Sequence, residues 1–372
     1  MKLSIERGAL LKSLAHVQNV VERRTTIPIL SNVKLAAKGE ELGLTATDMD
    51  LSLASRETAD IDTPGATTVS AHLLFDIVRK LPDGSRIDLE QPASGGEMTL
   101  RAGRSVFNLP TLPADEFPAM DSQSFDVSFV LASRDLARLI DKTRFAISTE
   151  ETRYYLNGVH FHATKGGAAS MLRGVATDGH RLARVEVGLP PGAERIPPVI
   201  VPRKTAGELR KLIEDGADEV GISLSPARIQ FAIGRAVLVS RLIDGTFPDY
   251  ERVIPSGNDK VATIRAKEFA AAVDRVATIS TEKARAVKLA FQAGRVTVSA
   301  VSAEAGRATE EIDAEFVGSP LEIGFNARYI LDMMQEIDGE EVRLEMASAA
   351  APTVIHDPSD DGTLYVLMPM RV

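Results

Sequence analysis

The sequence contains no cysteine and no long run of apolar residues. The absence of cysteine excludes a disulfide framework, a thiolate metal site and a cysteine nucleophile. It is typical of a protein of the reducing cytosol. No window approaches the about 18 consecutive apolar residues that a membrane-spanning helix needs. The first residues alternate apolar and polar side chains and include Glu6, so they lack the apolar segment of a signal peptide. We therefore expect a cytoplasmic protein with no membrane partner.

The usual motifs for phosphate and metal binding are also missing. The sequence has no Gly-x-x-x-x-Gly-Lys loop and no Gly-x-Gly-x-x-Gly turn. His160 and His162 are the only near pair among the six histidines, and on a strand both point to one face. Such a pair is weak evidence for a metal site. We expect no cofactor and no metal.

Asp178 and His180 are the residues most easily mistaken for a catalytic dyad. No serine-containing nucleophile elbow accompanies them. The segment 46–48, Ala-Thr-Asp, repeats the segment 176–178 but is not followed by a histidine. A turn role for Asp178 therefore explains the pattern better than catalysis does.

A helix, an Asp-Gly pair and a strand recur three times along the 372 residues. The Asp-Gly pairs stand at positions 83–84, 215–216 and 338–339, after helices predicted over residues 71–81, 203–213 and 327–337. We expect the glycine to end each helix in the left-handed conformation. Three further segments repeat in the same order: 146–153 with 278–285, 112–118 with 242–248, and 46–48 with 176–178. Three repeats of about 124 residues fill the chain.

Each repeat has the pattern of an α+β domain. A short alternating strand opens it, and two amphipathic helices are interspersed with further strands. The six helices are predicted over residues 6–16, 72–81, 133–144, 203–213, 266–276 and 327–337, with Ser133 as the N-cap of the third. Polar, turn-rich segments near 118–126 and 254–260 place the domains at 1–123, 127–253 and 260–372.

The charge is distributed unevenly between the helices and the rest of the chain. The net charge is −9, which by itself argues against a nucleic-acid partner. The six predicted helices carry a net charge of +6, so the remaining residues carry −15. Basic helices on an acidic protein suggest one face that attracts a polyanion, although solvated helix faces often carry Lys and Arg as well.

Two segments stand out as possible contact surfaces. Tyr154 and Tyr155 are adjacent in a chain with 5% aromatic residues; on a strand, one of them faces inward and the other outward. The C-terminal segment 364–372 is apolar almost to its end, with Met368 and Met370 on either side of Pro369. Part of this segment is expected to be a core strand, and an exposed remainder would bind a peptide.

The sequence resembles the bacterial DNA polymerase III beta sliding-clamp family along its whole length. The segments that carry this resemblance are 1–7, Met-Lys-Leu-Ser-Ile-Glu-Arg; 27–32, Ile-Pro-Ile-Leu-Ser-Asn; 153–158, Arg-Tyr-Tyr-Leu-Asn-Gly; 176–182, Ala-Thr-Asp-Gly-His-Arg-Leu; 199–204, Val-Ile-Val-Pro-Arg-Lys; 244–250, Asp-Gly-Thr-Phe-Pro-Asp-Tyr; 324–326, Gly-Phe-Asn; and 368–371, Met-Pro-Met-Arg.

The resemblance implies a non-enzymatic processivity factor of DNA replication. Two chains of three similar domains would pair head to tail as a homodimer, with helices lining the hole and sheets on the outside. The ring would slide on duplex DNA without sequence preference and tether the replicative polymerase, the clamp loader and other partners through a short apolar peptide motif. Twelve helices about 9 Å apart leave a hole of about 25 Å, wide enough for a duplex.

The resemblance also assigns residues. The DNA contacts correspond to Arg24, His72, Glu150, Tyr154 and Tyr155, where His72 and Glu150 depart from the family pattern and Glu150 would repel phosphate. The dimer contacts correspond to Phe107 and Leu109 against Thr278 and Ile279, and Ala284 replaces an aromatic residue at the edge of the cleft. The partner cleft corresponds to Arg153, Leu156, Thr177, Gly179, His180, Arg181, Leu182, Pro248, Arg252, Val253, Asn326, Tyr329, Val366, Met368, Pro369, Met370 and Arg371, with Arg153, Arg181 and Arg371 expected at its rim.

Two other functions remain open at this stage. A repeat scaffold that binds only peptides would lack a basic face. A hydrolase using Asp178 and His180 would need a nucleophile near His180 in the fold.

Overall fold

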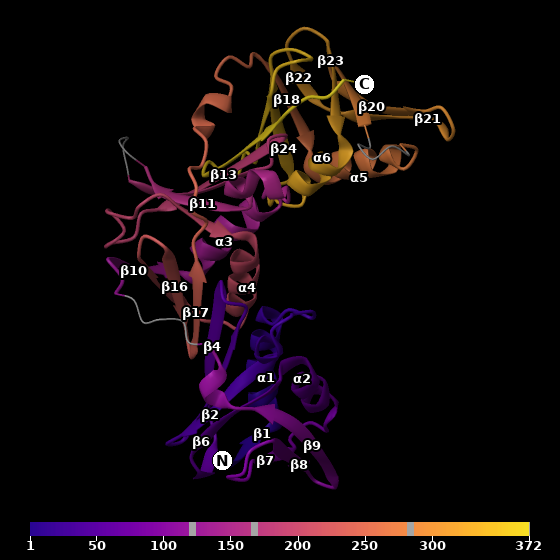
Figure 1. The fold of residues 1–372 in the computed structure, drawn as a ribbon. Helices are drawn as coiled ribbons and strands as arrows, with labels where there is room; N and C mark the ends of the chain where they lie inside the picture. The colour runs from indigo at the N-terminus through magenta and orange to yellow at the C-terminus, as the bar shows by residue number, and fades with distance from the viewer. Residues whose placement is uncertain (119–123, 165–169, 281–285, 372) are drawn as a thin grey trace. The chain divides into compact units, whose positions relative to one another are not determined.

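The computed structural model describes residues 1–118, 124–164, 170–280 and 286–371 (Figure 1). Its α-helices are α1 (Arg7–Val20), α2 (Ala71–Lys80), α3 (Ser133–Arg144), α4 (Arg203–Ile213), α5 (Ala266–Ala277) and α6 (Ala327–Met334). All six predicted helices are confirmed, two per repeat. The first is longer than predicted because Val17 and Val20 continue its buried face. The last is shorter, since Glu336 donates its main-chain N–H to Met333, in a turn tighter than an α-helix.

The described strands form three sheets. The first has the order β10 (Val127–Ala132), β15 (Glu219–Leu224), β16 (Arg228–Ile233), β17 (Ala236–Arg241), β4 (Leu51–Thr58), β3 (Glu41–Thr47), β2 (Asn32–Lys38), β6 (Gly65–Ser70), β9 (Ser105–Leu112), β8 (Glu97–Ala102), β7 (Arg86–Glu90), β1 (Lys2–Glu6), β5 (Asp60–Thr63). The second has the order β14 (Val199–Pro202), β11 (Gly158–Ala163), β12 (Met171–Thr177), β13 (Arg181–Gly188), β26 (Thr363–Leu367), β25 (Thr353–His356), β24 (Glu341–Met346), β18 (Lys260–Arg265), β22 (Glu315–Val317). The third has the order β21 (Gly306–Asp313), β20 (Arg295–Ser302), β19 (Ala286–Gln292), β23 (Leu321–Asn326).

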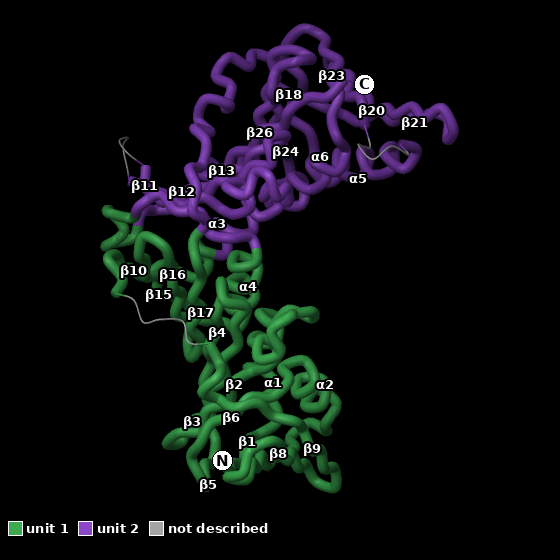
Figure 2. Tube along the Cα trace, viewed as in Figure 1, with its two compact units in different colours: residues 1–136, 190–196, 204–242 green, residues 137–189, 197–203, 243–372 purple. Residues whose placement is uncertain are grey.

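The chain folds into two compact units (Figure 2). Unit 1 consists of residues 1–136, 190–196 and 204–242, and unit 2 of residues 137–189, 197–203 and 243–372. Unit 1 contains the first sheet, and unit 2 contains the second and third. The unit borders differ from the repeat borders because antiparallel main-chain pairing crosses each repeat boundary. In unit 1, β17 of the second repeat pairs with β4 of the first; in unit 2, β13 of the second pairs with β26 of the third.

The helices bury the apolar residues that their spacing indicated. In unit 1, α1 packs on α2 and on β3 and β4, with Leu10 and Leu14 fully buried. In unit 2, α5 packs on α6 and on β20 and β21, with Phe269 and Val273 fully buried. Truncating one such leucine or phenylalanine to alanine costs about 2–5 kcal/mol, so these faces hold each helix on its sheet.

Three local predictions are wrong. Ser133 is the first helical residue rather than a cap, and its buried hydroxyl has no partner among the described residues. Gly84 and Gly216 have the left-handed conformation, with φ of 71° and 90°, but Gly339 does not, because it lies against Asp357, which accepts its N–H. Tyr154 and Tyr155 lie on a 3-10 helix, η3 (Glu151–Leu156), rather than on a strand.

No helix in the described ranges is both long and apolar enough to cross a bilayer.

Candidate functional site

An apolar groove of about 280 Å³ opens on the surface of unit 2. Its floor belongs to a buried cluster that includes Leu156, Leu182 and Val366, and Val253 and Met368 stand exposed above it. Ten residues that the sequence assigned to a partner cleft line this groove: Arg153, Leu156, Thr177, Gly179, Arg181, Leu182, Pro248, Val253, Val366 and Met368. The fold thus brings together residues from η3, β13, β26 and the segment after β17.

The other seven predicted cleft residues lie outside the lining. His180 and Tyr329 line a separate polar cavity, and their rings lie 6.3 Å apart. Asn326 caps α6 by accepting the N–H of Arg328 at 3.0 Å. The remaining four are Arg252, Pro369, Met370 and Arg371. Arg252 is exposed and pairs with Asp249, and Met370 donates its N–H to the carbonyl of Gly324 at 2.8 Å. Pro369 is half-buried and Arg371 is exposed.

Three lining residues were not predicted for the cleft: Tyr155, Asp249 and Tyr250. Asp249 and Tyr250 belong to the 244–250 segment of the family resemblance, so a signal for them was present in the sequence. Tyr155 was assigned to DNA instead, yet it lines the groove and packs against its buried cluster, while the neighbouring Tyr154 is 53% exposed.

The loop 177–181 shapes one wall of the groove through a tight turn. One carboxylate oxygen of Asp178 accepts the main-chain N–H groups of His180 and Arg181 at 2.9 and 3.0 Å. The Thr177 hydroxyl donates to the carbonyl of Arg181 at 2.7 Å. Asp178 therefore has the turn role that the sequence favoured. Its carboxylate bonds the main-chain N–H of His180 and not the imidazole ring, as a catalytic dyad would require.

Glycine is favoured at position 179 of this turn for two reasons. Its φ is 88°, a conformation that side chains rarely adopt. A Cβ atom at this position would also lie 2.5 Å from Nη1 of Arg153. The close approach of the guanidinium to the main chain therefore depends on the missing side chain.

Arg181 anchors the turn instead of serving at the rim, and this corrects the prediction of a rim donor. Its side chain is 8% exposed. The guanidinium donates to Asp178 at 3.1 Å, to Asp332 on α6 at 2.6 Å and to the carbonyl of Phe145 at 2.6 Å. It also stacks 4.3 Å above the ring of Tyr329. Bonds in three directions fix the wall of the groove and use three of the five N–H donors of this residue.

Arg153 reaches the groove as half of an ion pair. Its guanidinium donates to the carboxylate of Glu150 at 2.8 Å. This hydrogen bond lowers the pKa of Glu150 and raises the pKa of Arg153. Glu150, one of the predicted DNA contacts, thus orients a groove residue in this structure.

Two further predicted DNA contacts, Arg24 and His72, lie in unit 1. In unit 1, exposed Arg24 lines a polar cavity of about 390 Å³ together with Asp48 and Asp50. Also in unit 1, both ring nitrogens of His72 have partners, with Gln18 at 2.9 Å and the carbonyl of Val21 at 3.2 Å.

The predicted dimer contacts differ in how much surface they expose. Leu109 is 4% exposed and is already buried in its own chain, which corrects the expectation that it becomes buried between chains. Phe107 and Ile279 are half-buried, and Thr278 is exposed. Val106, which was not predicted, is 58% exposed on the same strand. Ala284 lies outside the described residues.

His160 and His162 lie on β11 with their rings 5.0 Å apart, so the prediction of a shared face is confirmed. Burial, reinforced by the charge of His162, lowers the pKa of His160 to about 4. His160 stacks 4.6 Å from Phe247, and His162 hydrogen-bonds the hydroxyl of Tyr250 at 3.0 Å. No cluster of three metal-ligating side chains occurs in the part of the chain that the structure describes.

The chain matches all three domains of one family along its length. Residues 1–121 match the DNA polymerase III beta subunit N-terminal domain, residues 130–249 its central domain and residues 251–371 its C-terminal domain. The beta sliding clamp of Caulobacter vibrioides is 53% identical over 372 residues, all of both chains. The beta sliding clamp of Escherichia coli K12 is 37% identical over 375 aligned positions, covering all of both chains.

Solved structures agree with this match. The beta sliding clamp of Caulobacter crescentus with bound polyethylene glycol superposes with a TM-score of 0.97 at 53% identity, covering 100% of this chain and 99% of that one. A sliding clamp from Bartonella birtlesii bound to griselimycin also has a TM-score of 0.97, at 46% identity and with both chains fully covered. The chain therefore belongs to the DNA polymerase III beta subunit family, the beta sliding clamps, which are non-catalytic processivity factors of DNA replication.

Proposed function

We propose that two copies of this chain close head to tail into a ring around duplex DNA in the cytoplasm. Three domains per chain, at residues 1–123, 127–253 and 260–372, would give six domains and line the hole with twelve helices. The net charge of +6 on the predicted helices of a chain with a net charge of −9 supports a basic inner face. Backbone contacts of this kind position DNA but read no sequence, as sliding requires.

The groove in unit 2 is the proposed docking site for the polymerase, the clamp loader and other partners. Its buried apolar floor and exposed Met368 fit small apolar side chains of a short extended peptide. Arg153 at the edge offers a charged donor for peptide carbonyls or acids. The single observation that carries this proposal is that ten of the residues assigned to a partner cleft by the family resemblance line one groove.

Assembly is tested by removing apolar side chains from the proposed dimer contacts. Phe107→Ala combined with Ile279→Ala takes away two half-buried side chains that have surface left to bury in a partner. Sedimentation at micromolar concentration is expected to show dimers for the wild type and monomers for the double variant. Leu109→Ala is the control for a purely internal contact: it is expected to lower the melting temperature without changing the mass. A double variant that stays dimeric would refute this interface.

A further inference from the structure

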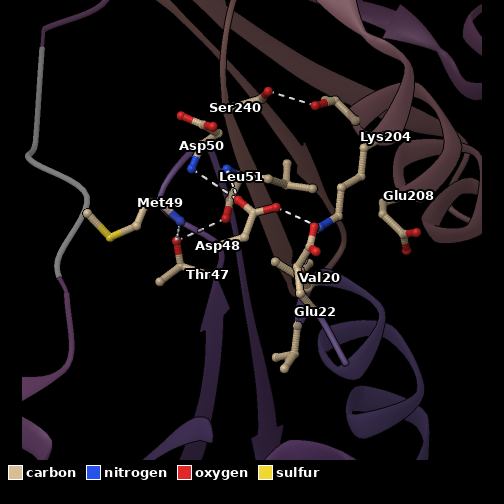
Figure 3. Close-up of polar contacts among 12 residues, drawn as sticks. Val20, Glu22, Thr47, Asp48, Met49, Asp50, Leu51, Lys204, Glu208 and Ser240 are labelled. Carbon is tan, nitrogen blue, oxygen red and sulfur yellow. Dashed lines mark hydrogen bonds and ion pairs between the residues drawn. The ribbon is translucent and has the colours of Figure 1, made fainter. Parts of the chain in front are cut away.

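Units 1 and 2 contain the same turn at corresponding positions of the first and second repeats. In the loop 47–51, Asp48 accepts the N–H groups of Asp50 and Leu51 at 3.0 and 2.7 Å, and the Thr47 hydroxyl donates to the carbonyl of Leu51 at 2.9 Å (Figure 3). These bonds repeat those of the loop 177–181. Met49 has a φ of 82°, close to the 88° of Gly179. The two turns are therefore comparable residue by residue.

In unit 1, the second carboxylate oxygen of this aspartate is occupied by a lysine. Lys204 on α4 donates to Asp48 at 2.6 Å, to the carbonyl of Val20 at 3.0 Å and to Glu22 at 3.2 Å (Figure 3). Burial lowers the pKa of Lys204, but the bonds and charges of Asp48 and Glu22 outweigh it and leave the pKa raised. The three protons of the ammonium group thus all have acceptors in this unit.

In unit 2, an arginine within the turn takes the place of that lysine. Arg181 stands where Leu51 stands in unit 1, and its Nε donates to the second oxygen of Asp178 at 3.1 Å. The counterpart of Lys204 is Arg328, since each is the second residue of its helix. Asp178 is occupied by Arg181, and no described residue forms a hydrogen bond or ion pair with the guanidinium of Arg328.

The free guanidinium of Arg328 borders a polar cavity of about 430 Å³ in unit 2. Arg203 also lines this cavity, and its side chain likewise forms no hydrogen bond or ion pair with a described residue. The three carboxylates of the cavity already have arginine partners: Asp178 and Asp332 share Arg181, and Glu150 pairs with Arg153. The two remaining cations are exposed arginines, whose planar donors fit an oxyanion.

We propose that Arg203 and Arg328 bind a phosphodiester of the DNA backbone in this cavity, an inference that rests on the proposed function of encircling DNA. Three observations favour DNA over an acidic partner peptide. The cavity is polar, with the exposed Thr149 hydroxyl in its wall, whereas the peptide groove is apolar. Arg181 separates the two, since it lines both. The loop 148–150 of the cavity also leads into Tyr154, which is 53% exposed and is a predicted DNA contact.

The test compares Arg328→Ala with a control, Arg307→Ala. Arg307 is also exposed, lies on β21, and its side chain forms no hydrogen bond or ion pair with a described residue. Binding of a short fluorescent duplex to the full-length protein is measured by anisotropy over a range of salt concentrations. Log K falls linearly as log salt rises, and each lost phosphate contact lowers the magnitude of this slope by about 0.9. Arg328→Ala is expected to lower the slope by that amount, Arg203→Ala by a similar amount, and Arg307→Ala by none. Arg328→Lys, which keeps the charge, is expected to restore the slope.

Sedimentation and thermal melting of each variant, together with the affinity for a clamp-binding polymerase peptide, complete the experiment. Unchanged mass, melting temperature and peptide affinity alongside the lower slope would support the phosphate site. Equal slopes for Arg328→Ala and Arg307→Ala would overturn it. Loss of peptide affinity with an unchanged slope would overturn it as well and assign the cavity to an acidic peptide side chain. Absence of salt-dependent DNA binding by the wild type would overturn this inference but not the proposed enclosure of DNA, which is tested separately by retention on circular DNA.

Discussion

The loop 47–51 in unit 1 and the loop 177–181 in unit 2 have the same hydrogen-bonded turn but different surroundings. In unit 1, Lys204 binds the turn from a neighbouring helix, and the nearby cavity is polar. In unit 2, Arg181 binds the turn from within and forms the wall of an apolar groove. The main-chain geometry of a repeat thus sets where a loop lies, while a few side chains decide whether a binding groove forms beside it.

The largest effect is expected from Arg181→Leu, which introduces the residue type of Leu51 into the second turn. Asp178 and Asp332 then lose their partner, and breaking such a buried pair costs about 3–5 kcal/mol. Lys204→Met in unit 1 is expected to cost about 1 kcal/mol, because this side chain is 35% exposed and Asp48 keeps its main-chain bonds. Urea denaturation measures both. A larger loss for Lys204→Met would contradict the contrast between the two turns.

An intermediate effect is expected where the turns share a left-handed residue. Gly179→Ala strains a φ of 88° by roughly 1–2 kcal/mol and pushes Arg153 away from the groove. Peptide affinity, measured by calorimetry, is expected to fall about tenfold, or ~1.4 kcal/mol. Met49→Gly relieves the same strain in unit 1 and is expected to raise the melting temperature without changing peptide affinity. Unchanged affinity in Gly179→Ala would show that Arg153 takes no part in peptide binding.

The smallest effect concerns pH and the floor beneath the groove. His160 has a pKa of about 4 in the folded chain against 6.5 in the unfolded one, so the unfolded state binds more protons between these values. Its contribution to stability is complete above pH 6.5 and is lost as pH falls towards 4. His160→Phe keeps the stacking on Phe247 but cannot titrate. The melting temperature of this variant is therefore expected to fall less than that of the wild type between pH 7 and pH 5. Parallel falls would assign the acid sensitivity to other groups.

Periodicity and repetition predict much of this fold. The six helices follow from apolar spacing, and the turn role of Asp178 follows from its counterpart at Asp48. Most of the groove lining follows from the family resemblance, since these residues belong to short matching segments. Such features depend on residues close together in the sequence.

The features that the sequence does not predict depend on contacts between distant residues. The pairing of β17 with β4 and of β13 with β26 makes each sheet continue across a repeat boundary, and no local pattern encodes it. Arg181 was expected at the rim of the groove. Its bonds to Asp332 and Phe145 join residues that are distant in the sequence, so the sequence did not show that this side chain is already bound. Leu109 was expected to lie between chains. Its burial within its own chain depends on tertiary packing, which the sequence does not reveal.

The most direct measurement of the central claim is retention on circular DNA. The protein is loaded onto a nicked circular duplex by a clamp loader, and gel filtration in high salt removes anything held only by phosphate contacts. The account predicts that the protein stays with the intact circle and is lost after a single cut makes the DNA linear, because the ring is held by topology. Equal loss from circular and linear DNA would contradict enclosure of the duplex.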